Sequence, residues 1–218
     1  MQTILAIDTC TEVLSVCLYH NNQQYSRFIQ GVEKSSGLVL NYCDEVLAEA
    51  QVGIEQVELI AYTKGPGAFT GVRMCVAVAQ GMAYAHNTPT LGLSTLEVVG
   101  YGARQEFNAE SVAVALDARM SEVYWGVYQQ GQLITEALKK PSEVDQLSTQ
   151  YFGVGTGWGA YEEDLKLASG VTHYQADFYP NAKYMIELAQ QKIAQVGFDD
   201  KLPLPTYLRN NVAQKSLK

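Results

Sequence analysis

The stretch ILAIDTCTEVLSVCL, residues 4–18, decides the fold of this chain. Its apolar start ends at Asp8, a short polar turn follows, and the residues beyond Glu12 alternate with the period of two that is typical of a half-buried strand. The stretch ALDARMSEVYWGVY, residues 115–128, repeats this plan, with Asp117 at the end of its first strand. Each half of the chain therefore opens with the same strand–turn–strand unit, which indicates an internal duplication.

The residues that follow the first unit predict the rest of one α/β lobe. After three strands we expect a helix from about Ser36 to Ala50, a strand in VELIAYT (57–63), a helix from about Gly71 to Ala85 and a strand in TPTLGLST (88–95). Helix caps are expected at Ser35 or Ser36 and at Ser94 or Thr95.

A polar segment, EFNAES (106–111), divides the chain. We therefore predict two lobes, residues 1–106 and residues 107–218. The second lobe is poorer in elements, with three strands, one long helix in NAKYMIELAQQKIAQVG (181–197) and a tail, LPLPTYLR (202–209), whose prolines exclude regular structure. The predicted fold class is α/β, with a βββαβα-type unit that occurs twice and is reduced in the second lobe.

Composition excludes several classes of protein. A net charge of −8 argues against binding of nucleic acid by this chain alone, since phosphate contacts need clustered Lys and Arg. The four cysteines form no C-x-x-C pair and the three histidines lie far apart, which predicts reduced thiols, no disulfide framework and no metal site. No apolar run reaches the ~20 residues of a membrane span, and we see no signal peptide, so a cytoplasmic location is expected.

The loop KGPGAFTGVRMC (64–75) raises the question of phosphate binding. It fits neither G-x-x-x-x-G-K-[ST] nor G-x-G-x-x-G, because its lysine precedes the glycines and Thr70 stands in the third glycine place. We interpret Gly65, Gly67 and Gly71 as structural residues of a strand-to-helix turn whose backbone angles favour glycine. Weak anion binding at the helix start stays open.

The helix after this loop is apolar or small almost all round, with Arg73 as its only charge. A surface helix normally shows a polar face. We therefore expect this helix to be buried in the fold or against another chain.

Five stretches occur in one order between residues 4 and 213: ILAIDTCTEVLSVCL, AYTKGPGAFTGVRMCVAVAQGMA, ALDARMSEVYWGVY, VGTGW and YLRNNVA. Together they resemble the TsaB family, also called YeaZ, of bacterial tRNA threonylcarbamoyladenosine biosynthesis proteins. The resemblance implies the two-lobed fold of actin, Hsp70 and hexokinase. It also implies a non-catalytic subunit that binds a larger homologue, TsaD, through its first lobe, with the ATPase TsaE completing the complex and tRNA bound indirectly. TsaD transfers threonylcarbamoyl from threonylcarbamoyl-adenylate to the adenosine 3′ of the anticodon in tRNAs that read codons beginning with A.

The same resemblance assigns two phosphate turns, which we expect to be vestigial. Cys10 and Arg119 stand where the D-x-G-T pattern of the actin-like fold has glycine, and the H-x-x-x-H metal pair of TsaD-type enzymes is missing. No cofactor is therefore expected, although Arg119 is able to neutralise a phosphate. The residues of these turns are Asp8, Thr9, Thr11, Asp117 and Arg119. Cys10 is interpreted as a buried structural cysteine, since an apolar setting raises the pKa of a thiol.

A partner surface is expected on the two first-lobe helices, which would pair with the same helices of TsaD or of a second copy of this chain. The candidate residues, spaced three to four apart, are Leu40, Val46, Leu47, Met74, Val78 and Met82. The alternative is an enzyme in its own right, either an ATP-dependent phosphotransferase or a metallopeptidase of the same superfamily. Asp117 and Glu122 are also candidates for an acid–base pair, whereas turn carboxylates on a solvated rim are the simpler interpretation. For the basic tail with Arg209, Lys215 and Lys218, three interpretations stay open: contact with tRNA, contact with a partner protein, or exposure to solvent.

Overall fold

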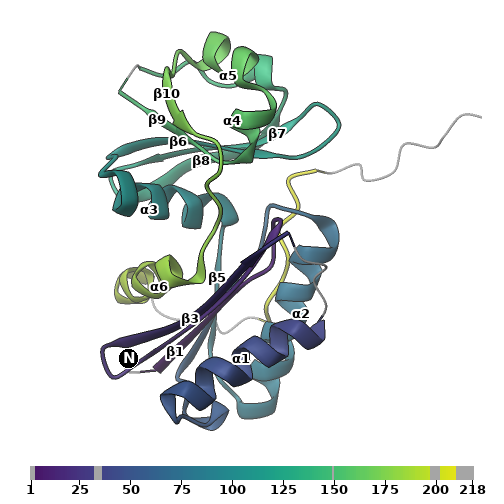
Figure 1. The fold of residues 1–218 in the computed structure, drawn as a ribbon, viewed down its shortest axis with the longest axis vertical. Helices are drawn as coiled ribbons and strands as arrows, with labels where there is room; N and C mark the ends of the chain where they lie inside the picture. The colour runs from purple at the N-terminus through teal and green to yellow at the C-terminus, as the bar shows by residue number, and fades with distance from the viewer. Residues whose placement is uncertain (1–2, 32–35, 149, 197–201, 210–218) are drawn as a thin grey trace, which may run out of the picture.

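The computed structural model describes residues 3–31, 36–148, 150–196 and 202–209. Two five-stranded sheets and the helices on their faces are stacked in layers (Figure 1). From the bottom of the view, the order is α1 with α2, the first sheet, α6, α3, the second sheet, and α4 with α5. The helices are α1 (Ser36–Ala50), α2 (Phe69–His86), α3 (Thr95–Phe107), α4 (Thr156–Ala160), α5 (Glu162–Ser169) and α6 (Ala182–Val196).

The first sheet has the strand order β3-β2-β1-β4-β5. Strands β1, β2 and β3 are antiparallel neighbours, whereas β1, β4 and β5 are parallel. Every residue of β1 is buried, because α1 and α2 cover one face of the sheet and α6 covers the other. The strands are β1 (Thr3–Asp8), β2 (Val13–His20), β3 (Gln23–Gln30), β4 (Leu59–Thr63) and β5 (Thr90–Leu93).

The second sheet repeats this plan, with the order β8-β7-β6-β9-β10 and the same antiparallel and parallel pairs. A 3-10 turn at Pro141–Glu143 stands where the first lobe has α1, and β9 and β10 have three residues each. The predicted fold class, a two-lobed α/β actin-like fold with a reduced second unit, is therefore confirmed. The strands are β6 (Ser111–Asp117), β7 (Val123–Gln129), β8 (Gln132–Lys139), β9 (Phe152–Val154) and β10 (His173–Gln175).

The two lobes exchange helices. Helix α3 packs against β6, β7 and β8 of the second sheet, and α6 packs against β1 and β2 of the first. One core cluster, with members such as Ile4, Leu96 and Met185, joins the facing sides of both sheets. The division between residues 106 and 107 stays a prediction. Two helices pack across it, because α3 lies almost wholly before the division and packs on the second sheet, whereas α6 lies after it and packs on the first sheet.

Local signals predicted most ends of elements closely. Helix α2 begins at Phe69 rather than at Gly71. Ser94 is the N-cap residue of α3, but its hydroxyl donates to Glu136 Oε2 at 2.5 Å and caps no backbone N–H. The cap candidate Ser35 lies outside the described residues. Among the helices that the structure describes, none is long and apolar enough to cross a membrane.

Candidate functional site

The first predicted phosphate turn is held below the surface. Asp8 is fully buried, and its Oδ1 accepts hydrogen bonds from Thr63 Oγ1 at 2.5 Å and from the backbone N–H of Cys10 at 3.2 Å. Thr9 Oγ1 donates to the carbonyl of Gly71 at 2.6 Å. These bonds tie the turn to β4 and to the start of α2, so that of its predicted residues Thr11 alone lines the cleft between the lobes.

The glycine loop packs directly on this turn. Gly65 has φ +99°, a backbone conformation that glycine adopts readily and other residues rarely do. At Gly67 and Gly71 the reason is different, because a Cβ would lie 2.1 Å from the carbonyl oxygens of Cys10 and Thr9 respectively. The N–H of Ala68 donates to the Cys10 carbonyl at 2.7 Å. The loop therefore serves as the contact between α2 and the first turn.

Cys10 is part of the core. Its side chain is fully buried, and Sγ donates to Thr63 Oγ1 at 3.1 Å. Burial raises the pKa of the Cys10 thiol well above its ordinary value, which keeps the thiol protonated near neutral pH. A protonated, inaccessible thiol is a poor nucleophile, in line with the structural interpretation.

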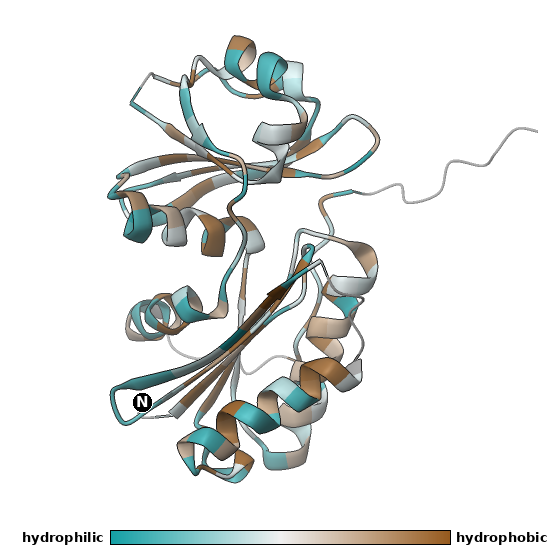
Figure 2. Ribbon diagram, in the orientation of Figure 1, coloured by the Kyte–Doolittle hydropathy of each residue, from teal (hydrophilic) through white to brown (hydrophobic). Residues whose placement is uncertain are grey.

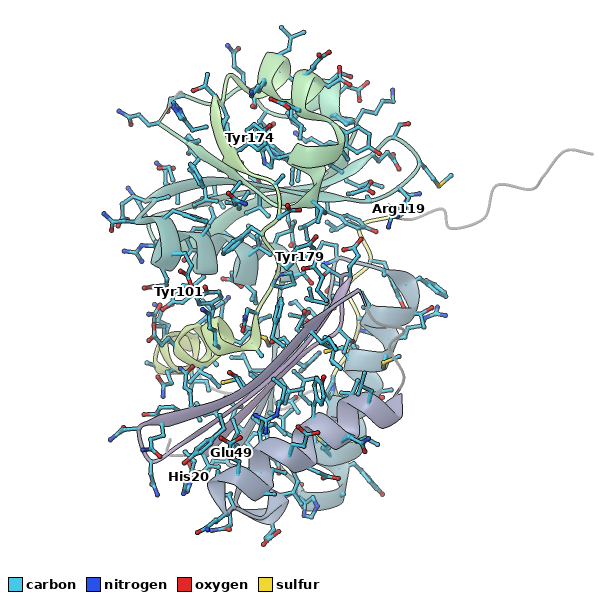
Figure 3. All side chains as sticks on the ribbon, viewed as in Figure 1. His20, Glu49, Tyr101, Arg119, Tyr174 and Tyr179 are labelled. Carbon is cyan, nitrogen blue, oxygen red and sulfur yellow. The ribbon has the colours of Figure 1, made fainter. Side chains whose placement is uncertain are left out.

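The second turn is neutralised by its own side chain. Arg119 Nη1 lies 2.7 Å from Asp117 Oδ2, and the backbone N–H of Arg119 donates to Asp117 Oδ1 at 2.9 Å. Arg119 Nη2 also pairs with Glu12 Oε1 of the first lobe at 3.3 Å. Figure 3 places Arg119 at the edge of the second lobe that faces the end of the described chain. Asp117 and Glu122 do not pair, because Glu122 Oε2 binds Arg209 at 2.6 Å.

A cavity of about 230 Å³ remains in the cleft between the two turns. Thr11, Asp117 and Arg119 line it, whereas Asp8 and Thr9 are buried and are not part of its lining. The C-terminal segment 202–209 forms part of the wall through Thr206, Tyr207, Leu208 and Arg209. No pattern in the sequence indicates that this segment lies there. Lys215 and Lys218 lie outside the described residues.

A second hollow lies on the outer face of the first lobe, between α1 and α2. The two helices run side by side, and both carry hydrophobic residues (Figures 1 and 2). The groove between them encloses about 500 Å³. Its apolar lining consists of Leu40, Leu47, Ile54, Met74, Ala77, Val78, Gly81, Met82 and Ala85, and its polar lining of Asp44 and His86.

Five of the six predicted interface residues line this groove. Leu40 is 43% exposed, and Met74 and Met82 are half-buried. Leu47 and Val78 are buried and form the floor. Val46 has no exposed surface and packs in the core of the first lobe, so we remove it from the predicted interface. The predicted interface does not include the small residues Ala77, Gly81 and Ala85, which also line the groove. Their spacing of four is visible in the sequence.

Comparisons with known proteins agree with this architecture. The matching family model is that of TsaD, described as tRNA N6-adenosine threonylcarbamoyltransferase, and it covers residues 32–217. The tRNA threonylcarbamoyladenosine biosynthesis protein TsaB of Escherichia coli (strain K12) is 37% identical over 98% of this chain and 97% of its own length. TsaB of Haemophilus influenzae is 35% identical over 99% of this chain and 97% of its own length.

A solved structure extends the similarity to three dimensions. YeaZ from Pseudomonas aeruginosa superposes with a TM-score of 0.86 at 38% identity, and the match covers 95% of this chain and 100% of that one. Sequence identity at this level over both full lengths leaves no room for a chance similarity of folds. The chain therefore belongs to the TsaB (YeaZ) family of tRNA threonylcarbamoyladenosine biosynthesis proteins.

Proposed function

We propose that this chain is the non-catalytic subunit of a threonylcarbamoyl-transfer complex and acts by binding a TsaD homologue through the α1–α2 groove. The groove itself carries the proposal. It is an open apolar hollow of about 500 Å³. The chain has a net charge of −8, which favours a hydrated surface, so an exposed apolar groove stands out on it. An exposed apolar groove of this kind is typical of a surface that another protein covers.

The shape of the groove suits a pair of helices. Small side chains at Ala77, Gly81 and Ala85 let a partner helix approach the backbone of α2, while Met74 and Met82 adapt to its side chains. The TsaD family model matches residues 32–217 of this chain, which supports a partner that carries a corresponding helix pair. Two such pairs would form a four-helix interface. The same face would serve a homodimer when TsaD is absent.

The state of the cleft supports a non-catalytic role. In the actin-like fold the two turns hold phosphates, yet here the Asp117 carboxylate binds Arg119 and the glycine loop packs on the first turn. The C-terminal segment occupies a further part of the wall. In this proposal TsaD performs the transfer, TsaE completes the complex in the cytoplasm, tRNA is bound indirectly, and this chain needs no cofactor.

Charged substitutions on each helix test the interface. Leu40→Glu on α1 and Met82→Glu on α2 place a carboxylate in the groove, and burial of an unpaired carboxylate costs several kcal/mol. Matched controls are Asn41→Glu and Tyr84→Glu, since Asn41 is exposed and Tyr84 is 90% exposed outside the groove lining. Size-exclusion chromatography with light scattering measures the complex with TsaD, and a circular dichroism melt checks the fold.

We expect the groove variants to melt like the wild type and to elute without TsaD, and the controls to elute with it. Normal pairing by both groove variants contradicts the proposed interface. The non-catalytic role is tested by mixing the chain alone with threonylcarbamoyl-adenylate and unmodified tRNA, followed by mass analysis of nucleosides. Formation of threonylcarbamoyladenosine without TsaD contradicts that role.

A further inference from the structure

The cleft between the lobes is bounded on two sides by different parts of the chain. On the left of Figure 1, α3, which packs on the second sheet, meets α6 below it, and their contact belongs to the shared core. On the right, the segment 202–209, drawn in yellow, rises beside α2 to the level of the cleft. It has no regular secondary structure, so its path depends on the contacts that it makes with both lobes.

Three hydrogen bonds fix this segment to the first lobe. The backbone N–H of Thr206 donates to the Lys64 carbonyl at 2.7 Å, and the N–H of Leu204 donates to Tyr62 Oη at 3.2 Å. Gln80 Nε2 of α2 donates to the Pro203 carbonyl at 2.5 Å. These donors and acceptors bind main-chain atoms of the segment. The attachment therefore fixes its backbone rather than one side chain.

Tyr207 adds a side-chain anchor near the cleft. Its hydroxyl accepts a hydrogen bond from Arg73 Nε at 2.9 Å, and its ring lies 6.3 Å from that of Phe69. The Arg73 guanidinium is also 3.5 Å from the centre of the Phe69 ring, a cation–π contact. The start of α2 thus holds the segment two residues before it reaches the second lobe.

Arg209 attaches the segment to the second lobe. Its Nη2 pairs with Glu122 Oε2 at 2.6 Å and donates to the Ala118 carbonyl at 3.0 Å, both in the turn that follows β6. The side chain of Arg209 is only 17% exposed. An ion pair that is largely shielded from solvent and also bonds a carbonyl is stronger and more directional than a surface pair.

We propose that residues 203–209 form an intramolecular strap that locks the two lobes together across the mouth of the cleft. Two-lobed proteins commonly open and close about a bound ligand. In this chain the strap reinforces two direct contacts between the lobes at the cleft, the Arg119–Glu12 ion pair at 3.3 Å and the hydrogen bond from Tyr124 Oη to the Gly67 carbonyl at 3.4 Å. These contacts lie around the cavity and not at the α3–α6 contact. Pro203 and Pro205 restrict the backbone of the strap before it binds, which lowers the entropy that is lost when it is ordered. The lobes are thereby held in one relative orientation without a ligand.

Distances between the lobes test the strap. Spin labels at Asn41→Cys on α1 and Leu167→Cys on α5 report on the two lobes, since both positions are exposed and the native cysteines are buried. Two variants remove the lock: a chain that ends at residue 201, and Arg209→Ala in the full chain. A chain that ends at residue 209 is the matched control, because it keeps the strap. Pulsed electron spin resonance measures the distribution of distances, and circular dichroism checks the fold.

We expect a single narrow distribution for the full chain and for the chain that ends at residue 209. The chain that ends at residue 201 should show a broader distribution that extends to longer distances, and Arg209→Ala should broaden it in part. If the chain that ends at residue 201 does not fold, the distance distribution of the Arg209→Ala variant tests the strap. An unchanged narrow distribution in a folded variant without the Arg209 contact overturns the proposal. The result does not depend on binding to TsaD.

Discussion

Arg119 reaches back to the carboxylate of Asp117, two residues earlier, and bonds it both from its backbone N–H and from its guanidinium. The backbone of Arg119 takes the left-handed conformation, with φ +60°, and Met120 and Ser121 follow with φ +57° and +58°. A turn of this shape favours glycine at each of these positions. The chain therefore keeps a conformation suited to glycine while carrying an arginine.

Two substitutions at Arg119 separate the effect of backbone strain on stability from the effect of the ion pairs. Arg119→Gly and Arg119→Ala both remove the ion pairs with Asp117 and Glu12, but only glycine is relaxed at φ +60°. We expect Arg119→Gly to be more stable than Arg119→Ala by about 1 kcal/mol. Urea unfolding of the two variants measures the difference. Equal stability would mean that the turn changes shape when the arginine is lost.

The glycine loop should tolerate no side chain at two positions. Gly67→Ala and Gly71→Ala place a Cβ 2.1 Å from a backbone carbonyl oxygen, so α2 must shift from the first turn. We expect a loss of about 1–3 kcal/mol or more in the free energy of unfolding. The control is Gly81→Ala, which meets no atom within 4 Å and should gain up to about 1 kcal/mol in the helix. Similar melting temperatures for all three variants would show that the loop is not a packed contact.

The four thiols should not react with thiol reagents in the folded protein. All four cysteines are buried, and burial raises the pKa of Cys17 and of Cys43 to about 12. At pH 8 a thiol with such a pKa is about 0.01% thiolate, the form that reacts. We expect a disulfide reagent to titrate no thiol in the native protein and four in guanidinium. Rapid reaction of one thiol in the folded state would identify an open path to the core.

The second lobe should lose stability in acid through Asp145. The hydrogen bond from Lys139 lowers the pKa of this carboxyl, and Trp125 Nε1 donates to it at 3.1 Å. Because the folded pKa is below the unfolded one, the contribution is present above about pH 4 and disappears as the pH falls through the folded pKa. Asp145→Asn should therefore be less stable than the wild type at pH 7, with the difference shrinking toward pH 2. Glu143→Gln, which removes an exposed pair with Lys140, should change little at any pH.

If one groove serves both assemblies, they should compete. A homodimer of this chain and its heterodimer with TsaD would bury the same face of α1 and α2. We expect added TsaD to convert any homodimer to heterodimer, and Leu40→Glu to abolish both. Light scattering across a titration measures the populations. A ternary species that holds two copies of this chain joined through the groove, with TsaD bound elsewhere, would separate the two surfaces.

Strands and their duplication were predictable because their signals are local. An apolar run that ends at Asp8 or Asp117, followed by alternation, defines β1–β2 and β6–β7 without knowledge of distant residues. The interface was harder to resolve, because α1 is apolar on adjoining faces. Val46 and Leu47 are neighbours, yet Val46 is enclosed in the core and Leu47 reaches the floor of the groove. Only the placement of α2 beside α1 distinguishes them.

The strap had no periodic signal at all. Its prolines correctly excluded regular structure, but extended segments carry no pattern that indicates what they contact. The acceptor of Arg209 is Glu122, 87 residues earlier in the chain. The role of Gly67 was similarly hidden, since its need for glycine arises from the carbonyl of Cys10 in another segment.

The exchange of helices between the lobes has a consequence for how the protein is made. The first sheet is complete once β5 has been synthesised, but the helix that covers its inner face, α6, is encoded near the end of the chain. A ribosome takes seconds to make the residues in between. Throughout that interval a nascent chain carries a finished sheet with one apolar face open to the cell. The open face of the first sheet is therefore protected from aggregation only when α6 has been made and packs on it.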